Sequence, residues 1–453
     1  MLRVYKNIII VVSILVVICF AAVMIVLYGS ENANNEDAKA SDQMIFETTQ
    51  KISIYLDEMS DKSIANEIAE ENIDDANDEA NDANDEIVDD KKTNPNIEII
   101  YLTPEEKYKA SNKFEKIDTR EKKDVFCFVG DVFLSKKPRT AYDEHGLSGI
   151  IDDGYLKLLK DSDFNVANLE CSITDDTENA EDKTFTFALP TEYVTPLKEV
   201  GFNLFTLANN HILDYGVDSM MNTIKVLDEN DFIHIGAGKN IEEAKRAYIK
   251  EIDGKRYAFL SASAVLPTDN WKATYDRAGV FNGYDISELC DEVRNVKPFV
   301  DKVIVYMHWG RELETVSNTW QKQYARRIVD AGADLIVGAH PHMVQEIEYY
   351  KNVPIIYSLG NFIYGGTMRD TILVTATFDY SIDKNGHMQL VVYPGLSNYE
   401  KVRKDWKKDE IAAKIKELQD KSSTCYIGDN GYVFTMEQVA EALSSIEKSQ
   451  QIN

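Results

Sequence analysis

From about residue 122 onward, short apolar runs alternate with stretches in which apolar residues recur every three or four positions. Short apolar runs are typical of buried strands, and the longer periodic stretches are typical of amphipathic helices. We expect strands at residues 124–129, 164–168, 204–207, 257–261, 302–307 and 335–337. We expect helices at residues 155–160, 191–200, 217–229, 285–294 and 320–331. This alternation predicts a layered α/β domain of mixed sheets flanked by helices.

The pattern changes after Pro354. Strands are expected at residues 355–358, 371–378 and 388–393, with no helix between them. Such a succession is typical of an antiparallel arrangement, and it is consistent with a second sheet. Two further helical patterns, at residues 408–421 and 436–448, are expected on the surface. We therefore assign residues 122–400 to the folded domain and residues 401–453 to a helical C-terminal extension.

Residues 8–28 show a different pattern, because they are apolar almost throughout. At roughly 1.5 Å per residue, a helix of this length spans about 31 Å, close to the hydrocarbon thickness of a lipid bilayer. Arg3 and Lys6 precede the run and acidic residues follow it, which places residues 1–7 in the cytoplasm. The run is also longer than the apolar part of a signal peptide. We expect a retained signal anchor that crosses the cell membrane once, with the main domain outside the cytoplasm.

Charge separates this apolar run from the folded domain. The 453 residues include 77 acidic and 49 basic side chains, a formal net charge of −28. Residues 30–95 hold 20 Asp and Glu against 5 Lys. Low hydrophobicity and like charges cannot offset the entropy lost on ordering, so residues 29–121 are expected to form a disordered acidic linker. The acidity, with no long Lys and Arg run, excludes nucleic acid as a partner.

Polar groups follow five of the predicted strands where each strand ends. They are Asp131, Glu170, Asn210-His211 with Asp214, His308 with Glu312, and His340-Pro341-His342. In an open α/β sheet the carboxyl ends of the strands form the ligand-binding edge, so these groups can converge. Each has an ordinary alternative, such as a helix N-cap for Asp131 or a turn for Asn210. Their coincidence favours a metal site, because carboxylate and imidazole groups bind ions such as Zn, Mn and Fe.

The order of these residues resembles that of two related groups of proteins. Asp131, Asn210-His211, His308 and Gly338-Ala339-His340-Pro341-His342 resemble the calcineurin-like metallophosphoesterase pattern. Adding Asn168-Leu169-Glu170, His308-Trp309-Gly310 and Tyr357-Ser358-Leu359-Gly360-Asn361-Phe362 makes the chain similar to the CapA family of poly-γ-glutamate capsule biosynthesis proteins. The resemblance covers about residues 125–394. It implies a metallophosphoesterase-like fold behind a single membrane anchor.

The resemblance also implies a centre with two divalent metal ions, of Mn, Fe or Zn. The implied ligands are Asp131 and His342 for the first ion, Asn210, His308 and His340 for the second, and Glu170 as the bridge. His211 would be the general acid, and Asp214 would orient it. Glu312 and Asn361 would support the ligands or contact the substrate.

Two residues depart from the broader phosphoesterase pattern. Phe133 stands where that superfamily has the histidine of an Asp-x-His motif, so the first ion lacks one imidazole. Glu170 stands where the superfamily has an aspartate. Either the first site is weak and rich in water, or a neighbour such as Cys171 or Glu312 completes it. For Cys171, a buried and inert thiol is the more ordinary role.

The remaining cysteines outside the apolar run are Cys127, Cys290 and Cys425, and their spacing fits neither metal ligation nor a redox pair. We expect them to be mostly free thiols.

Three functions are compatible with these observations. The first is an exported metal-dependent hydrolase or transferase that acts on an anionic cell-envelope polymer or its phosphorylated precursor. The second is a non-catalytic accessory subunit of a membrane polyglutamate synthase. The third is a metal-stabilised binding module. Retention of His211 beside the ligands of the second ion favours catalysis, whereas Phe133 favours the accessory role.

Overall fold

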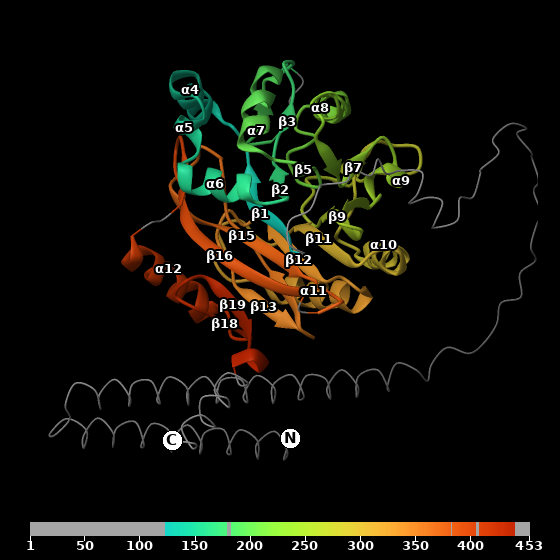
Figure 1. Cartoon of the computed structure of the whole chain (residues 1–453). Helices are drawn as coiled ribbons and strands as arrows, with labels where there is room; N and C mark the ends of the chain where they lie inside the picture. Colours follow the sequence, from blue (N-terminus) through green and yellow to red (C-terminus); the bar gives the residue numbers. More distant parts are fainter. Residues whose placement is uncertain (1–122, 179–182, 382, 405–406, 440–453) are drawn as a thin grey trace, which may run out of the picture. The chain divides into compact units, whose positions relative to one another are not determined.

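The structure, a computed structural model, describes residues 123–178, 183–381, 383–404 and 407–439 (Figure 1). The predicted membrane anchor at residues 8–28, the acidic linker and most of the helix predicted at residues 436–448 lie outside the described residues, so these stay predictions. In the part of the chain that is described, no helix is long and apolar enough to cross a membrane.

The first of two large sheets has nine strands. Its parallel half consists of β1 (Lys123–Val132), β2 (Phe164–Leu169), β5 (Leu204–Thr206) and β6 (Ile233–Ile235). On the other side of β1, the antiparallel half consists of β15 (Arg369–Asp379), β16 (His387–Ser397), β17 (Val402–Lys404), β18 (Cys425–Ile427) and β19 (Tyr432–Thr435). The antiparallel pairing predicted for the last long strands is therefore confirmed.

The second large sheet has six strands. Its parallel centre consists of β9 (Lys255–Ser263), β11 (Lys302–His308), β12 (Leu335–Ala339) and β14 (Val353–Ile356). The antiparallel edge strands are β8 (Tyr248–Ile252) and β13 (Ile347–Tyr350). Two short pairs, β3 (Ser172–Ile173) with β4 (Ala188–Leu189) and β7 (Ala237–Gly238) with β10 (Gly279–Val280), lie outside both sheets.

One strand assignment from the sequence was wrong. The sequence grouped residues 355–358 with the antiparallel strands, but β14 lies parallel to β12 in the second sheet, while β15 and β16 join the first. The hairpin from β13 to β14 explains the difference, because its turn residues Lys351 and Asn352 adopt positive φ angles and reverse the chain. An apolar run does not reveal the sheet in which it pairs.

Helices cover the outer faces of both sheets. Those packed on the first sheet are α4 (Lys136–His145), α5 (Leu147–Ile150), α6 (Asp153–Asp161), α7 (Val194–Val200) and α8 (Gly216–Glu229), which gather on one side of the strands in Figure 1. Those packed on the second sheet are α9 (Ile241–Ala244), α10 (Ser287–Val296) and α11 (Thr319–Ala331). Helix α12 (Lys408–Lys421) packs beside β16 and β18, and the short 3₁₀ helices are η1 (Thr191–Tyr193), η2 (Asp269–Trp271) and η3 (Lys297–Phe299).

The apolar residues of the central strands alternate between two cores. In β1, Phe126 and Phe128 enter the core between the two sheets, whereas Cys127 and Val129 face the helices. Because successive strand side chains point to opposite faces, a strand buried on both faces reads as one continuous apolar run. The predicted layered α/β domain of mixed sheets flanked by helices is therefore confirmed.

The sequence missed several elements with weak apolar patterns. Helix α4 buries only Pro138 and Ala141, so its sequence shows little helical periodicity. Strands β18 and β19 are short and lie in the extension that was predicted to be helical. The pairing of β19 with β16, and of β18 with β19, accounts for these strands better than their local sequence does.

Candidate metal centre

Strand ends from both large sheets meet at one place. Asp131 lies near the end of β1, and Glu170 follows β2 directly. The second sheet contributes His308, the last residue of β11, and the His340-Pro341-His342 segment that follows β12. The predicted convergence of these side chains is present, and it occurs between two sheets instead of along the edge of one.

The first group of ligand atoms surrounds one nitrogen of His342. The Nδ1 atom of His342 lies 3.3 Å from Asp131 Oδ2 and 3.8 Å from Glu170 Oε2. Asn361 Oδ1 is closer, at 2.7 Å from the same nitrogen. Asp131 and Glu170 are fully buried, and Asn168 fixes the other carboxylate oxygen of Asp131 by donating a 2.8 Å hydrogen bond. Such a group of donors could hold a metal ion.

The second group uses the other carboxylate oxygen of Glu170. Glu170 Oε1 lies 3.4 Å from His308 Nε2, and Asn210 Oδ1 lies 2.7 Å from the same nitrogen. The imidazole rings of His308 and His340 are 4.8 Å apart, and both residues are buried. Glu170 is thus shared by two groups of donors, with one oxygen facing each.

The burial of these groups fits a bound cation. Both carboxylate oxygens of Glu170 and the Nδ1 atom of His340 are buried without a hydrogen bond of normal geometry to a described residue, although the Tyr364 phenol interacts with the Glu170 carboxylate. An unpaired buried polar atom costs about 1–3 kcal/mol, and a charged one costs more. A metal ion between the oxygens and the ring nitrogens would satisfy all three atoms, so the residues present fit the cofactor that the sequence resemblance implies.

The environment sets the protonation of the three histidines differently. Burial lowers the pKa of His308 well below its usual value and that of His340 to about 3, so both rings are neutral, as metal ligands must be. Burial also lowers the pKa of His342, but the carboxylates of Glu170 and Asp131 outweigh it and raise the pKa to about 9. Burial and the charge of Asp131 raise the pKa of Glu170.

His211 lies beside the second group with its ring held on two sides. Its Nδ1 atom is 2.6 Å from Asp214 Oδ2, the contact expected of an orienting carboxylate. The ring of Phe187 stacks on the imidazole at 3.9 Å, and the Phe187 backbone N–H donates to Asp214 Oδ2 at 2.8 Å. Burial lowers the pKa of His211, and Asp214 partly opposes this effect.

Lys183 is part of this arrangement, and the sequence pattern did not reveal it. Its ammonium group pairs with Asp214 Oδ1 and donates a 2.6 Å hydrogen bond to the carbonyl oxygen of Asn210. It also lies 5.0 Å from the centre of the Trp271 ring. Lys183 does not follow the end of any predicted strand, so the sequence pattern did not select it. Only the folded chain brings Lys183 to His211.

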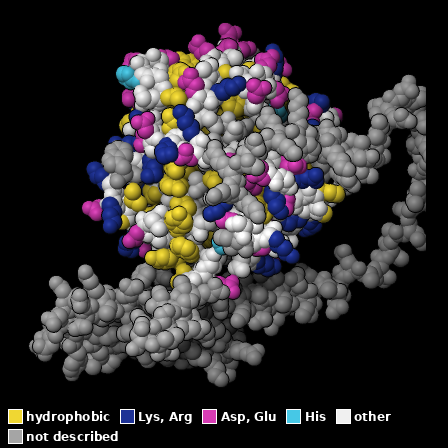
Figure 2. All heavy atoms as spheres, in the orientation of Figure 1, with side chains coloured by type: hydrophobic (Ala, Val, Ile, Leu, Met, Phe, Trp, Pro, Cys, Tyr) yellow, Lys and Arg dark blue, Asp and Glu magenta, His cyan; other side chains and the backbone are white. Residues whose placement is uncertain are grey.

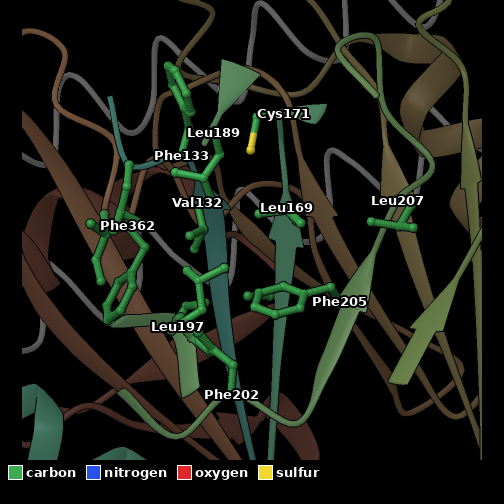
Figure 3. Packing of buried hydrophobic residues seen from close by; sticks show 14 of the residues in the cluster. Val132, Phe133, Leu169, Cys171, Leu189, Leu197, Phe202, Phe205, Leu207 and Phe362 are labelled. Carbon is green, nitrogen blue, oxygen red and sulfur yellow. The ribbon is translucent and has the colours of Figure 1, made fainter. Parts of the chain in front are cut away.

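The neighbours proposed to complete the first site do not lie in either ligand group. Cys171 is a free thiol buried in the core between the first sheet and its helices, where burial raises its pKa (Figure 3). Glu312 is exposed, although its charge contributes to the raised pKa of Glu170. Phe133 packs in the same core as Cys171, with its ring stacked 4.6 Å from that of Phe187.

Comparison with known proteins identifies similar chains. Residues 125–365 match the family model described as "Bacterial capsule synthesis protein PGA_cap". The PGA biosynthesis protein CapA of Bacillus subtilis is 31% identical over 312 residues, which cover 67% of this chain and 80% of that protein. The capsule biosynthesis protein CapA of Bacillus anthracis is 32% identical over 280 residues, which cover 60% of this chain and 66% of that protein.

Solved structures show a more distant likeness. A crystal structure described as a novel phosphatase of Mycoplasma pneumoniae is 13% identical and has a TM-score of 0.41. The matched region covers 62% of this chain and 95% of that one. A TM-score below 0.5 does not establish a shared fold.

Proposed function

Because the chain belongs to the bacterial capsule synthesis protein family PGA_cap, we propose that it is a metal-dependent phosphoesterase-type hydrolase of capsular poly-γ-glutamate biosynthesis or export. Its substrate is an anionic envelope polymer or a phosphorylated precursor of one. Its partners are the subunits of a membrane polyglutamate synthase. Residues 8–28 anchor it in the lipid bilayer and leave the folded domain outside the cytoplasm.

The observation that carries this proposal is the sharing of the buried Glu170 carboxylate between two groups of ligand atoms. In the proposal, Asp131 and His342 would hold a first divalent ion, and Glu170 would be shared with a second. Asn210, His308 and His340 would hold the second ion. Two such ions would activate a water molecule and offset the negative charge of a phosphoryl group.

The protein supplies the proton and the surroundings for this reaction. Because Nδ1 of His211 faces Asp214, Nε2 is the ring nitrogen left to give a proton to the leaving oxygen. Asp214 stabilises the charged ring that forms when His211 is protonated, and Phe187 covers one face of the ring against water. Lys183 holds Asp214 and the Asn210 backbone in place.

The test uses the full-length chain purified in detergent. We expect bound divalent metal by elemental analysis, and metal-dependent turnover of bis(p-nitrophenyl) phosphate. His211→Ala should lower turnover by about 100-fold or more while the metal stays bound. His145→Ala is the matched control, because His145 is exposed on α4 and should leave turnover unchanged. A wild-type chain without bound metal would contradict the hydrolase proposal. Full activity in His211→Ala would contradict the general-acid role of His211.

A cellular experiment addresses the polymer and the membrane. Deletion of the gene should lower envelope poly-γ-glutamate, and removal of residues 1–29 should release the protein from the membrane fraction. Unchanged polymer in the deletion strain would count against the capsule role. A truncated chain that still sediments with membranes would count against the anchor at residues 8–28.

One observation favours a second function. Phe133 takes the place of a superfamily imidazole and packs in an apolar core, so the first ion has one fewer histidine than the superfamily pattern provides. A non-catalytic accessory subunit of the synthase, stabilised by metal, would need no complete first site. Bound metal without phosphodiester turnover, together with loss of polymer on deletion, would support this alternative.

A further inference from the structure

The two ligand groups share a feature that the sequence resemblance does not provide. In each group a carboxamide oxygen lies 2.7 Å from the imidazole nitrogen that faces the shared Glu170. At the second group the pair is Asn210 and His308, and at the first it is Asn361 and His342. Of these two asparagines, the resemblance implied a metal-ligand role only for Asn210. It implied that Asn361 supports the ligands or contacts the substrate.

The fold holds Asn361 at this position through its backbone. The chain from Gly360 to Ile363 runs beside the end of β1, where Asp131 and Asn361 form a parallel bridge. The N–H of Asp131 donates to the Gly360 carbonyl at 3.1 Å, and the N–H of Phe362 donates to the Asp131 carbonyl at 2.8 Å. A third hydrogen bond of 2.7 Å runs from the N–H of Phe133 to the Ile363 carbonyl.

The Asn361 side chain is buried beside the other candidate ligands of the first group. Asn361 is 4% exposed, and its Oδ1 atom shares the His342 Nδ1 atom with the carboxylates of Asp131 and Glu170. Three oxygens from three different segments therefore surround one ring nitrogen. The Nδ1 atom of His342 can donate only one hydrogen bond, whereas a bound metal ion would attract all three oxygens at once.

We propose that Asn361 Oδ1 is the fourth protein ligand of the first metal ion and takes the place of the imidazole that Phe133 removes. This inference rests on the proposed two-ion centre. The first site then has Asp131, Glu170 and Asn361 oxygens with the single His342 nitrogen. The second site has two oxygens, from Glu170 and Asn210, and two nitrogens, from His308 and His340.

The two sites consequently differ in the ion that they prefer. Carboxylate and carbonyl oxygens suit Mg and Mn, and imidazole suits Zn, Fe and similar ions. The first site, with three oxygens, accepts a hard ion such as Mn²⁺ more readily than the second site does. The second site, with two imidazoles, retains Zn²⁺ more strongly. The difference gives the inference a measurable consequence that does not depend on turnover.

Tyr364 is the competing candidate for the same coordination position. Its ring lies 5.1 Å from that of His342, and its phenol interacts with the carboxylate of Glu170. It packs edge-on against Phe133 and Phe187 at 5.9 Å. Tyr364→Phe keeps this packing and removes only the hydroxyl, so it is a matched control for Asn361→Ala.

The experiment counts metal ions in the full-length chain after addition of one equivalent of Zn²⁺, then excess Mn²⁺, and removal of free ions, so that Zn²⁺ fills the stronger site first. Wild type and Tyr364→Phe should each hold two ions per chain, one Mn²⁺ and one Zn²⁺. Asn361→Ala should lose the Mn²⁺ and keep the Zn²⁺, and Asn361→Asp, which retains an oxygen donor, should hold both. His308→Ala should hold one ion per chain, because it removes a ligand of the second site and leaves the first site intact.

Crystals of the Mn²⁺-loaded wild type test the same point without a variant. An anomalous map should place Asn361 Oδ1 in direct contact with the first ion, at about 2–2.6 Å. Two ions in Asn361→Ala, or an Oδ1 atom beyond that distance, would overturn the ligand role of Asn361 and leave the two-ion centre standing. Loss of Mn²⁺ in Tyr364→Phe would transfer the role to Tyr364. Absence of any ion from wild type would instead overturn the proposed function.

Discussion

At the scale of single residues, His340 and His342 are only two positions apart, yet their surroundings shift the pKa values of the two imidazoles in opposite directions. The buried ring of His340 has a pKa of about 3, and its Nδ1 atom has no hydrogen-bond partner among the described residues. The pKa of His342 is about 9, because the carboxylates of Glu170 and Asp131 outweigh the effect of burial. Without a metal, the charge of His342 therefore offsets part of the negative charge of the carboxylates.

The stability of the metal-depleted chain should fall as the pH rises through 9. The folded-state pKa of His342, about 9, lies above its ordinary value of 6.5, so its contribution is full below pH 6.5 and is lost above 9. A difference of this size is worth at most about 3 kcal/mol. Urea unfolding in EDTA at pH 6.5 and 9.5 should show a smaller loss for His342→Gln than for wild type. Equal losses in the two chains would contradict the assignment.

Lys183 contacts Asp214 and the backbone of Asn210 beside His211. Asp214 is fully buried and accepts from Lys183, His211 and the Phe187 backbone, so its charge is shared by two possible cations. The ammonium group of Lys183 contributes to lowering the pKa of His211. Lys183 is therefore a positioning residue for the proposed acid.

Replacement of Lys183 should change the pH profile as well as the rate. Lys183→Met should reduce phosphodiester turnover by about 10-fold and move the limb of the profile that reports His211 to higher pH, because a cation is removed. Lys183→Arg should restore most of the rate. Lys225→Met is the control, since Lys225 is exposed on α8. A rate loss with an unmoved profile would point to a purely structural role.

At the scale of elements, the ends of β1 and β12 are shaped by close backbone contacts. A Cβ atom on Gly130 would lie 1.7 Å from the Gly360 carbonyl oxygen, and one on Gly338 would lie 2.0 Å from that of Tyr357. Beyond β12, both motif histidines have positive φ angles, 97° for His340 and 57° for His342. Such conformations are rare for residues other than glycine and are typical of functional sites.

Gly130→Ala should destabilise the domain because the Gly360 carbonyl leaves no space for a methyl group. We expect a loss of about 3 kcal/mol or more, since overpacking a core costs about 1–3 kcal/mol and here the obstacle is backbone. Urea unfolding measures the loss. Gly366→Ala is the control, because its Cβ would meet only the Tyr364 ring at an ordinary 3.6 Å. Equal stability of the two variants would show that the segment from Gly360 moves aside.

At the scale of the whole molecule, the centre lies where the two large sheets meet. Asp131 and Glu170 come from the first sheet, and His308 and His340 come from the second. The apolar core between the sheets lies behind them. Acidic and basic side chains are interspersed on the face seen in Figure 2, so that face offers no broad basic surface to a polyanion. Ions bound between these side chains would therefore link the two sheets.

Removal of metal should lower the stability of the whole domain. Each ion that binds only the folded chain contributes about 2.7 kcal/mol at a free concentration about 100 times its Kd. Thermal unfolding of wild type should shift to lower temperature when EDTA replaces Mn²⁺ and Zn²⁺. His308→Ala, with the second site disabled, should show a smaller shift. If EDTA left the unfolding temperature of wild type unchanged, this would contradict the view that bound metal joins the two sheets.

Much of the fold and the candidate site could be predicted from local patterns. The alternation of strands and helices, the polar groups at strand ends and the pairing of His211 with Asp214 depend on short stretches of chain. The free state predicted for Cys127, Cys171, Cys290 and Cys425 is also confirmed. These features can be predicted because residue periodicity and the order of motifs are visible in the linear sequence.

Other features depended on contacts between distant residues. Only the folded chain places β14 in the second sheet, forms α4 with few apolar residues, and brings Lys183 to Asp214. The sequence by itself determined which residue types stand at the ends of the strands. The tertiary structure decided that Glu170 serves two groups of donors and that Asn361 faces His342, because both contacts join segments that approach only when the two sheets pack together.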